Sequence, residues 1–268
     1  MRPRIASVLV AAALAVACGS STTTPTSPTP GLGLGPAPSP VPAPMVDSFT
    51  YDADVSPSDR QLIESASVIS RTFFERQVGR ALAMGITFII KSSGGLANAG
   101  NMRVNLSIVD PSGRRVGGAA MTKIVGHEMF HLVQQNSGWP SVSDWPLEGS
   151  AEFVGYAISA SAGFTTYEDV KTCQLARYID SPQISATPLE EVFPRQVDGR
   201  YGIAWLAWDH ILNGEAGIPL LGRYLQGMSF EQSFGKDMPA TLADFAEYRK
   251  TLRRPPGGAC ITRDGTSL

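Results

Sequence analysis

The first half of the chain carries one helical pattern followed by two strand patterns. Apolar residues recur at helical spacing after a Ser-Pro-Ser-Asp start signal, which predicts a helix from Ser56 to about Ala83. Ile86 to Lys91 is a short apolar run that is typical of a buried strand. Apolar and polar residues alternate from Asn101 to Asp110, and this alternation predicts a second strand with one buried face.

The second half of the chain is mostly helical in pattern. Met121 to Gln135 carries an apolar stripe at helical spacing, and Asn136-Ser137-Gly138 supplies a stop signal. Further apolar helical segments follow Trp145 and Tyr201. The sequence therefore predicts an α+β protein, with a small helix-plus-sheet lobe first and a mainly helical lobe after it.

The predicted helix from Met121 contains the HExxH motif His127-Glu128-Met129-Phe130-His131. Residues four apart lie on one face of a helix, so the imidazoles of His127 and His131 can reach the same metal ion. Glu128 follows the first histidine, where its carboxylate can take a proton from a water on the metal. The motif predicts a catalytic zinc site. The alternative is an ordinary helix that carries these letters by chance.

A catalytic zinc usually has three protein ligands and one open position. A third histidine in the pattern HExxHxxGxxH is missing, because Gln134 and Ser137 occupy the required positions. Glu148 and Glu152 are again four residues apart, and two buried acids on one apolar helix face would be costly without cations or hydrogen bonds. One acid can bind the zinc while the other supports a ligand. A solvated acidic face is the alternative.

These residues resemble the gluzincin metallopeptidases, the superfamily of thermolysin and aminopeptidase N. The resemblance rests on the HExxH motif and on the segment Glu148-Gly149-Ser150-Ala151-Glu152 downstream of it. It implies His127, His131 and Glu148 as zinc ligands, Glu128 as general base, and Glu152 as a residue that supports a ligand from behind. It also implies a gluzincin-like fold with zinc in the cleft between the two lobes, and hydrolysis of peptide bonds.

A second match lies further along the chain. Arg200 to Leu206 resembles the segment where some gluzincins place a catalytic tyrosine, which implies that Tyr201 stabilises the oxyanion. His210 is the rival, because the thermolysin branch uses a histidine for this purpose. The two residues lie about 180° apart on one helix, so they are not expected to face the metal together. Neither residue need be catalytic, and His210 would then be a core histidine bonded to a backbone carbonyl.

Two features bear on how a peptide would bind. Aminopeptidases of the superfamily carry a Gly-x-Met-Glu-Asn segment for the substrate's amino terminus, and Gly117 to Met121 lacks its acid. Endopeptidase and exopeptidase action therefore both stay open. If the strand Asn101 to Asp110 lies at a sheet edge beside the metal, its free backbone groups can pair with an extended peptide. An interior strand is the alternative.

The first 45 residues predict export. After the basic start Met1 to Arg4, the apolar run Ile5 to Ala17 is shorter than the roughly 20 residues that a bilayer-spanning helix needs, so residues 1–17 are predicted to be a signal peptide. Ala15-Val16-Ala17-Cys18 resembles a bacterial lipoprotein signal, which implies a lipid on Cys18; a plain secretion signal is the alternative. Residues 18–45 are predicted to be a disordered Ser/Thr/Pro-rich tether, and residues 46–268 the catalytic domain.

The net charge and the cysteine content add little to the prediction of function. The net charge is −2 without a dense basic cluster, so no nucleic-acid partner is expected. Cys173 and Cys260 can form a disulfide in an oxidising compartment or remain buried thiols.

We expect a zinc-dependent peptidase in the bacterial cell envelope that acts on peptides or proteins and contacts the membrane only through a lipid anchor on Cys18. The alternatives are a non-catalytic zinc-containing surface lipoprotein that acts as a binding module, and a metal-dependent hydrolase of other bonds.

Overall fold

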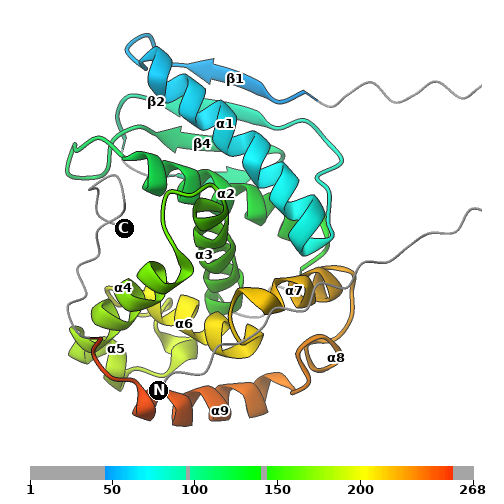
Figure 1. The fold of residues 1–268 in the computed structure, drawn as a ribbon, viewed down its shortest axis with the longest axis vertical. Coiled ribbons are helices and arrows are strands. Elements are labelled where there is room, and N and C mark those ends of the chain that lie inside the picture. Colours follow the sequence, from blue (N-terminus) through cyan, green and yellow to red (C-terminus); the bar gives the residue numbers. More distant parts are fainter. Residues whose placement is uncertain (1–45, 95–96, 140–143, 256–268) are drawn as a thin grey trace, which may run out of the picture. The chain divides into compact units, whose positions relative to one another are not determined.

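The computed structural model of the protein describes residues 46–94, 97–139 and 144–255. Within these ranges the chain forms a small sheet followed by a series of helices, so the predicted α+β class is confirmed (Figure 1). The predicted signal peptide, the lipidated Cys18 and the tether lie outside the described residues. Cys173 is buried and disulfide-bonded, but its predicted partner Cys260 also lies outside the described residues.

The sheet has four strands in the order β1-β2-β4-β3. Its strands are β1 (Ser48–Tyr51), β2 (Thr87–Lys91), β3 (Asn98–Gly100) and β4 (Arg103–Ser107). The first three strands in this order are parallel, and β3 pairs antiparallel with β4. The strand predicted from Ile86 to Lys91 is present as β2.

The second predicted strand is shorter than its alternating pattern. Asn101 and Met102 have φ angles of 51° and 56°, which place them in the turn between β3 and β4 rather than in a strand. The hypothesis that this strand is a free sheet edge is wrong, because β4 pairs with β2 on one side and with β3 on the other. The edge strand on this side is β3.

Helix α1 (Pro57–Phe73) crosses the sheet and packs against α2 (Figure 1). Its start agrees with the sequence, since Ser56 caps it by accepting a hydrogen bond from the backbone N–H of Asp59. The helix continues as a π-helical turn over Phe74–Val78 and stops at Gly79, which has a φ of 71°. The predicted end at Ala83 is therefore wrong, because a left-handed glycine ends the helix earlier than the apolar pattern indicated.

The remaining helices form the second part of the fold. They are α2 (Gly118–Asn136), α3 (Asp144–Ser161), α4 (Tyr167–Ile179), α5 (Pro182–Ala186), α6 (Arg200–Leu212), α7 (Ile218–Leu225), α8 (Phe230–Phe234) and α9 (Met238–Thr251). Helix α3 packs between α2 and α6, and Trp145, Trp205 and Trp208 are almost completely buried around it. These tryptophans belong to the hydrophobic core. Among the described residues, none of the helices combines the length and the apolar character that a membrane span requires.

Candidate metal centre

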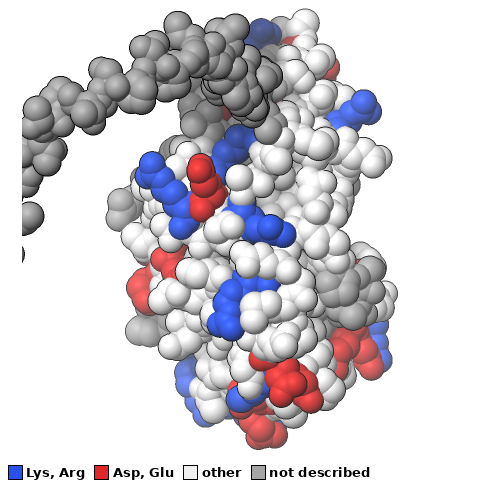
Figure 2. Space-filling model, turned by 90° about the vertical axis from the view of Figure 1, so that its right-hand side faces the viewer, with Lys and Arg blue, Asp and Glu red and all other residues white. Residues whose placement is uncertain are grey.

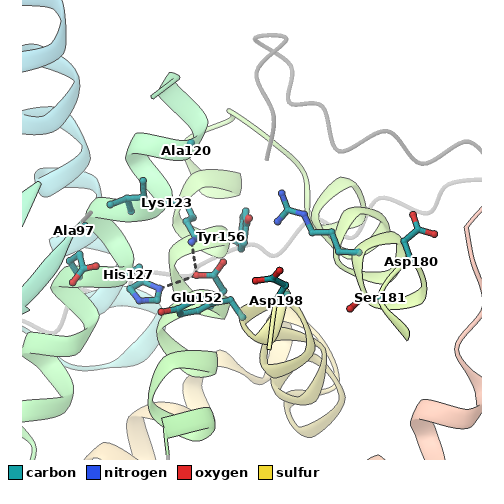
Figure 3. A pocket seen from close by; sticks show the side chains of 15 residues that line it. Ala97, Ala120, Lys123, His127, Glu152, Tyr156, Asp180, Ser181 and Asp198 are labelled. Atoms are coloured by element: carbon teal, nitrogen blue, oxygen red, sulfur yellow. Dashed lines mark ion pairs between the residues drawn. The ribbon is translucent and has the colours of Figure 1, made fainter. Parts of the chain in front are cut away.

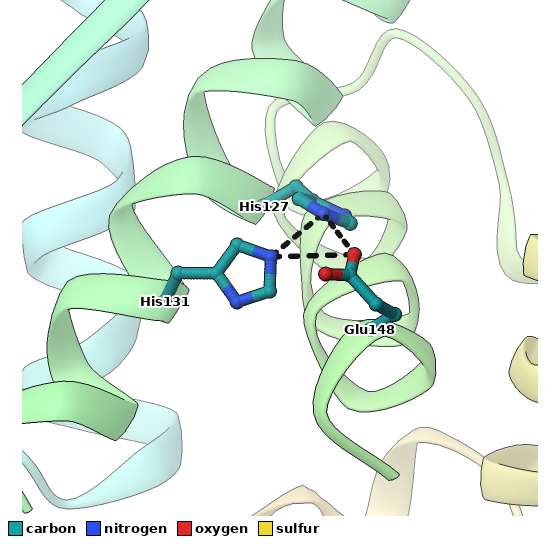
Figure 4. Close-up of side chains that lie close together, drawn as sticks. All are labelled: His127, His131 and Glu148. Carbon is teal, nitrogen blue, oxygen red and sulfur yellow. Dashed lines mark hydrogen bonds and ion pairs between the residues drawn. The ribbon is translucent and has the colours of Figure 1, made fainter. Parts of the chain in front are cut away.

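Three side chains from two neighbouring helices converge on one point. His127 and His131 lie on successive turns of α2, and their Nε2 atoms are 3.1 Å apart. Oε2 of Glu148, from the first turns of α3, lies 3.4 Å from each of these two nitrogens. Figure 4 shows both imidazoles and the carboxylate pointing toward the space between the helices. The structure therefore brings together the three residues that the sequence singled out as ligands.

The spacing of these atoms fits a metal ion. Bonds of about 2.0–2.1 Å in a tetrahedral site place neighbouring ligand atoms roughly 3.3 Å from one another. The three distances in the protein, 3.1, 3.4 and 3.4 Å, are close to that value. The group formed by His127, His131 and Glu148 can thus bind one metal ion.

Close packing of α2 against α3 makes this convergence possible. The two helices are antiparallel: Ser159 Oγ near the end of α3 donates a hydrogen bond to the carbonyl of Ala119 near the start of α2, at 3.0 Å. A Cβ atom on Gly155 would lie only 2.7 Å from the carbonyl oxygen of Lys123, and one on Gly126 would lie 2.7 Å from Cδ1 of Ile158. Because the close atom at Gly155 belongs to the backbone, glycine at this position lets α3 approach α2 until Glu148 reaches the histidines.

A further side chain lies next to the other nitrogen of each imidazole. Nδ1 of His131 donates to Oε1 of Gln134 at 2.8 Å, while Nε2 of Gln134 donates to Oγ of Ser150 at 2.8 Å and to the carbonyl of Leu147 at 3.1 Å. The amide of Gln134 is oriented by its own two donor contacts, so it presents its oxygen to His131. This arrangement leaves the Nε2 lone pair of His131 free for a metal.

Glu152 lies at ion-pair distance from the other nitrogen of His127. Its Oε2 atom lies 3.1 Å from Nδ1 of His127 and 2.5 Å from Nζ of Lys123. Burial opposes ionisation of Glu152, but the positive charge of Lys123 lowers the pKa of the carboxyl to about 2. Of the two acids proposed from the sequence, Glu148 faces both Nε2 atoms, while Glu152 lies next to Nδ1 of His127, the nitrogen that faces away from the metal position.

The sequence motifs do not single out Lys123 or Gln134. Lys123 lies four residues before His127, so the stripe that carries both histidines could have indicated it. In the motif comparison, Gln134 is only a departure from the three-histidine pattern. Its position three residues after His131 on a buried helix face is the signal that was available.

Burial and charge oppose one another in the pKa values at the centre. Burial disfavours protonation of His127, but contacts with Glu148 and Glu152 outweigh it and raise the pKa of the imidazole to about 9. Burial also disfavours the charged form of Glu148, yet its contacts with both histidines hold the pKa of this carboxyl well below its usual range. The site therefore favours a positive charge between these groups, and a bound cation supplies one in place of a proton.

A cavity of about 680 Å³ opens beside the centre. Its walls come from α2, α3, the end of α4 and the start of α6, and His127, Glu128 and Tyr201 lie in its lining (Figure 3). Burial raises the pKa of the Glu128 carboxyl above its usual range. The ring of Tyr201 lies 6.2 Å from that of His127, and the side chain is 37% exposed. A molecule in the cavity would meet Glu128 and Tyr201 next to the candidate metal ligands.

His210 lies apart from this site, near the opposite end of α6 from Tyr201. Its Nε2 is 2.9 Å from Oδ2 of Asp244, and its ring stacks on Tyr248 with 4.2 Å between the ring centroids. The expected backbone-carbonyl partner is therefore wrong, since the partner is a carboxylate.

On the face drawn in Figure 2, basic and acidic side chains are scattered among uncharged ones and form no continuous basic surface over the described residues.

When the chain is compared with known protein families and with curated proteins, nothing matches it.

Proposed function

We propose that the protein is a zinc-dependent peptidase of the gluzincin type. The observation that carries the proposal is the arrangement of His127, His131 and Glu148, whose ligand atoms are spaced like three corners of a tetrahedral site. Two imidazoles and one carboxylate are a donor set that zinc prefers when one position is left for catalysis. A zinc ion held there would polarise a substrate carbonyl and make a coordinated water more acidic.

The protein's own residues would carry the proton transfers. Glu128 lies in the cavity wall one residue from the first ligand, and its raised pKa suits a group that accepts a proton and releases it again. It would take the proton of the attacking water and pass it to the leaving amine. The hydroxyl group of Tyr201 would donate a hydrogen bond to the oxyanion that forms at the carbonyl.

The edge of the sheet offers a place for the substrate backbone. Among the described residues, strand β3 pairs with β4 alone; it packs near α2 and follows directly after Ala97 in the cavity lining. An extended peptide can add to such an edge through main-chain hydrogen bonds, while one of its side chains enters the cavity. This geometry supports cleavage within an extended segment. Export and a lipid anchor on Cys18 remain part of the proposal.

Two measurements on the full-length protein test the function. Elemental analysis is expected to find one zinc per chain. A peptide-library digest is expected to show cleavage that stops when a chelator removes the metal and returns when zinc is restored. Zinc binding without cleavage of any peptide would contradict peptidase activity and point to hydrolysis of another bond or to a binding role.

A further inference from the structure

Lys123 places a positive charge behind the candidate metal centre. Its side chain is only 18% exposed, and its Nζ atom lies 2.5 Å from Oε2 of Glu152 and 5.2 Å from the ring centroid of Tyr156. A buried ammonium group needs partners that offset the loss of water. Here these partners are one carboxylate and one aromatic face. The ion pair with Glu152 therefore fixes the position of the Lys123 ammonium group.

The same carboxylate oxygen is shared with a candidate ligand. Oε2 of Glu152 lies 3.1 Å from Nδ1 of His127, so a single atom is within ion-pair distance of both an ammonium group and an imidazole. The side chain of Glu152 is 5% exposed and has little contact with solvent. Figure 3 shows Lys123, Glu152 and His127 connected in this order along the cavity wall.

The charges around the centre explain what the ammonium group adds. A divalent ion bound by His127, His131 and Glu148 would have a further carboxylate, Glu152, beside the other nitrogen of its ligand His127. The ammonium group of Lys123 pairs with that carboxylate at 2.5 Å and offsets its negative charge.

We propose that Lys123 is a positioning residue of the metal centre, whose ammonium group holds Glu152 against His127 and offsets the charge of that carboxylate. The inference rests on the metal-binding part of the proposed function and is independent of the bond that is cleaved. It predicts that Lys123 and Glu152 act on the metal as a coupled pair.

A double-mutant cycle on the full-length protein tests the coupling. The variants are Lys123→Met, Glu152→Gln and the combination of both, and the Kd for Zn²⁺ is measured by competition with a chromophoric chelator. Glu152→Gln leaves an unbalanced ammonium group near His127 and is expected to raise the Kd by about 10-fold or more. Adding Lys123→Met to that variant removes the repulsion and is expected to lower the Kd again. In the protein that retains Glu152, Lys123→Met is not expected to lower the Kd for Zn²⁺, because the Glu152 carboxylate then loses the ion pair that positions it.

Two further measurements separate positioning from simple stabilisation. The visible spectrum of the Co²⁺-substituted protein is expected to change in Lys123→Met and to return toward the original in Lys123→Arg. Lys171 provides a matched control, since its Nζ also pairs with a buried carboxylate, Asp209, at 3.0 Å and lies 5.6 Å from the ring centroid of Tyr167. Lys171→Met is expected to lower the melting temperature without changing the Kd for Zn²⁺ or the cobalt spectrum.

The outcomes are distinguishable. If Lys123→Met changes the Kd by the same factor with and without Glu152, or leaves the cobalt spectrum unchanged, Lys123 only stabilises the fold and the inference is wrong. If the unaltered protein binds neither Zn²⁺ nor Co²⁺, the proposed function fails together with the inference. If it binds zinc but cleaves no peptide, only the peptidase activity is lost, and the coupling still decides the role of Lys123.

Discussion

Substitution of Gly155 by alanine should push the two metal-binding helices apart. The added Cβ would lie 2.7 Å from the carbonyl oxygen of Lys123 and 3.2 Å from Cβ of His127, whereas ordinary contact begins near 3.4 Å. Both neighbours belong to the body of α2 and cannot rotate away. Relief of the closer contact therefore requires α3 to move by the difference between 2.7 and 3.4 Å. Overpacking of this kind costs about 1–3 kcal/mol of stability.

The same movement would carry Glu148 away from the histidines. Its Oε2 now lies 3.4 Å from each Nε2 atom, and metal–ligand bond lengths are expected to agree with their usual values to within about 0.2 Å. We therefore expect Gly155→Ala to weaken zinc binding by at least about 10-fold, a change of about 1.4 kcal/mol in binding free energy. Urea denaturation of the metal-free protein would give the stability, and chelator competition would give the Kd.

Gly126 supplies the control for this experiment. Its added Cβ would also meet an atom at 2.7 Å, but that atom is Cδ1 of Ile158, at the free end of a flexible side chain. Gly126→Ala should therefore cost less stability than Gly155→Ala and change the Kd for zinc less. Equal effects of the two substitutions, or no effect of Gly155→Ala on either quantity, would refute the idea that backbone approach sets the ligand geometry.

Three further predictions concern the chemistry of the site. Glu128→Gln should keep a full zinc content but lower kcat by about 10²–10⁴-fold, because the general base is lost; a fully active variant would rule out this role. Tyr201→Phe should lower kcat by about 10²–10³-fold with little change in KM, as measured on one cleaved peptide, and an unchanged kcat would exclude oxyanion stabilisation by its hydroxyl. In the metal-free protein, the raised pKa of His127 adds stability that is complete below pH 6.5 and is lost as the pH rises through about 9, so urea midpoints should fall over that range. A midpoint that rises with pH there would contradict this assignment.

The sequence predicted those parts of the structure that depend on local spacing. Residues four apart on one helix must share a face, so the pairing of His127 with His131 follows from their positions in the chain alone. The same argument could not choose between Glu148 and Glu152, because both lie on one face of α3. That choice depends on how deeply α3 packs against α2, and the close backbone approach at Gly155 sets this depth.

The sheet shows where local patterns stop being informative. Alternation alone extended a strand through Asn101 and Met102, although the positive φ angles of both residues place them in a turn. Strands β1 and β3 have only four and three residues, too few for a period of two to stand out. Whether β4 is an edge or an interior strand depends on pairing between distant segments, which no short pattern records.

The placement of the candidate ligands on two consecutive helices has a consequence for how the chain folds. The ligands span only residues 127–148, whereas the parallel pairing of β1 with β2 joins segments on either side of α1. Closing a short loop costs less chain entropy than closing a long one, so the α2–α3 hairpin can form early. A divalent cation would then cross-link the two helices of this hairpin before the sheet is complete. Helical structure should therefore recover faster when zinc is present during refolding than when zinc is added only after refolding.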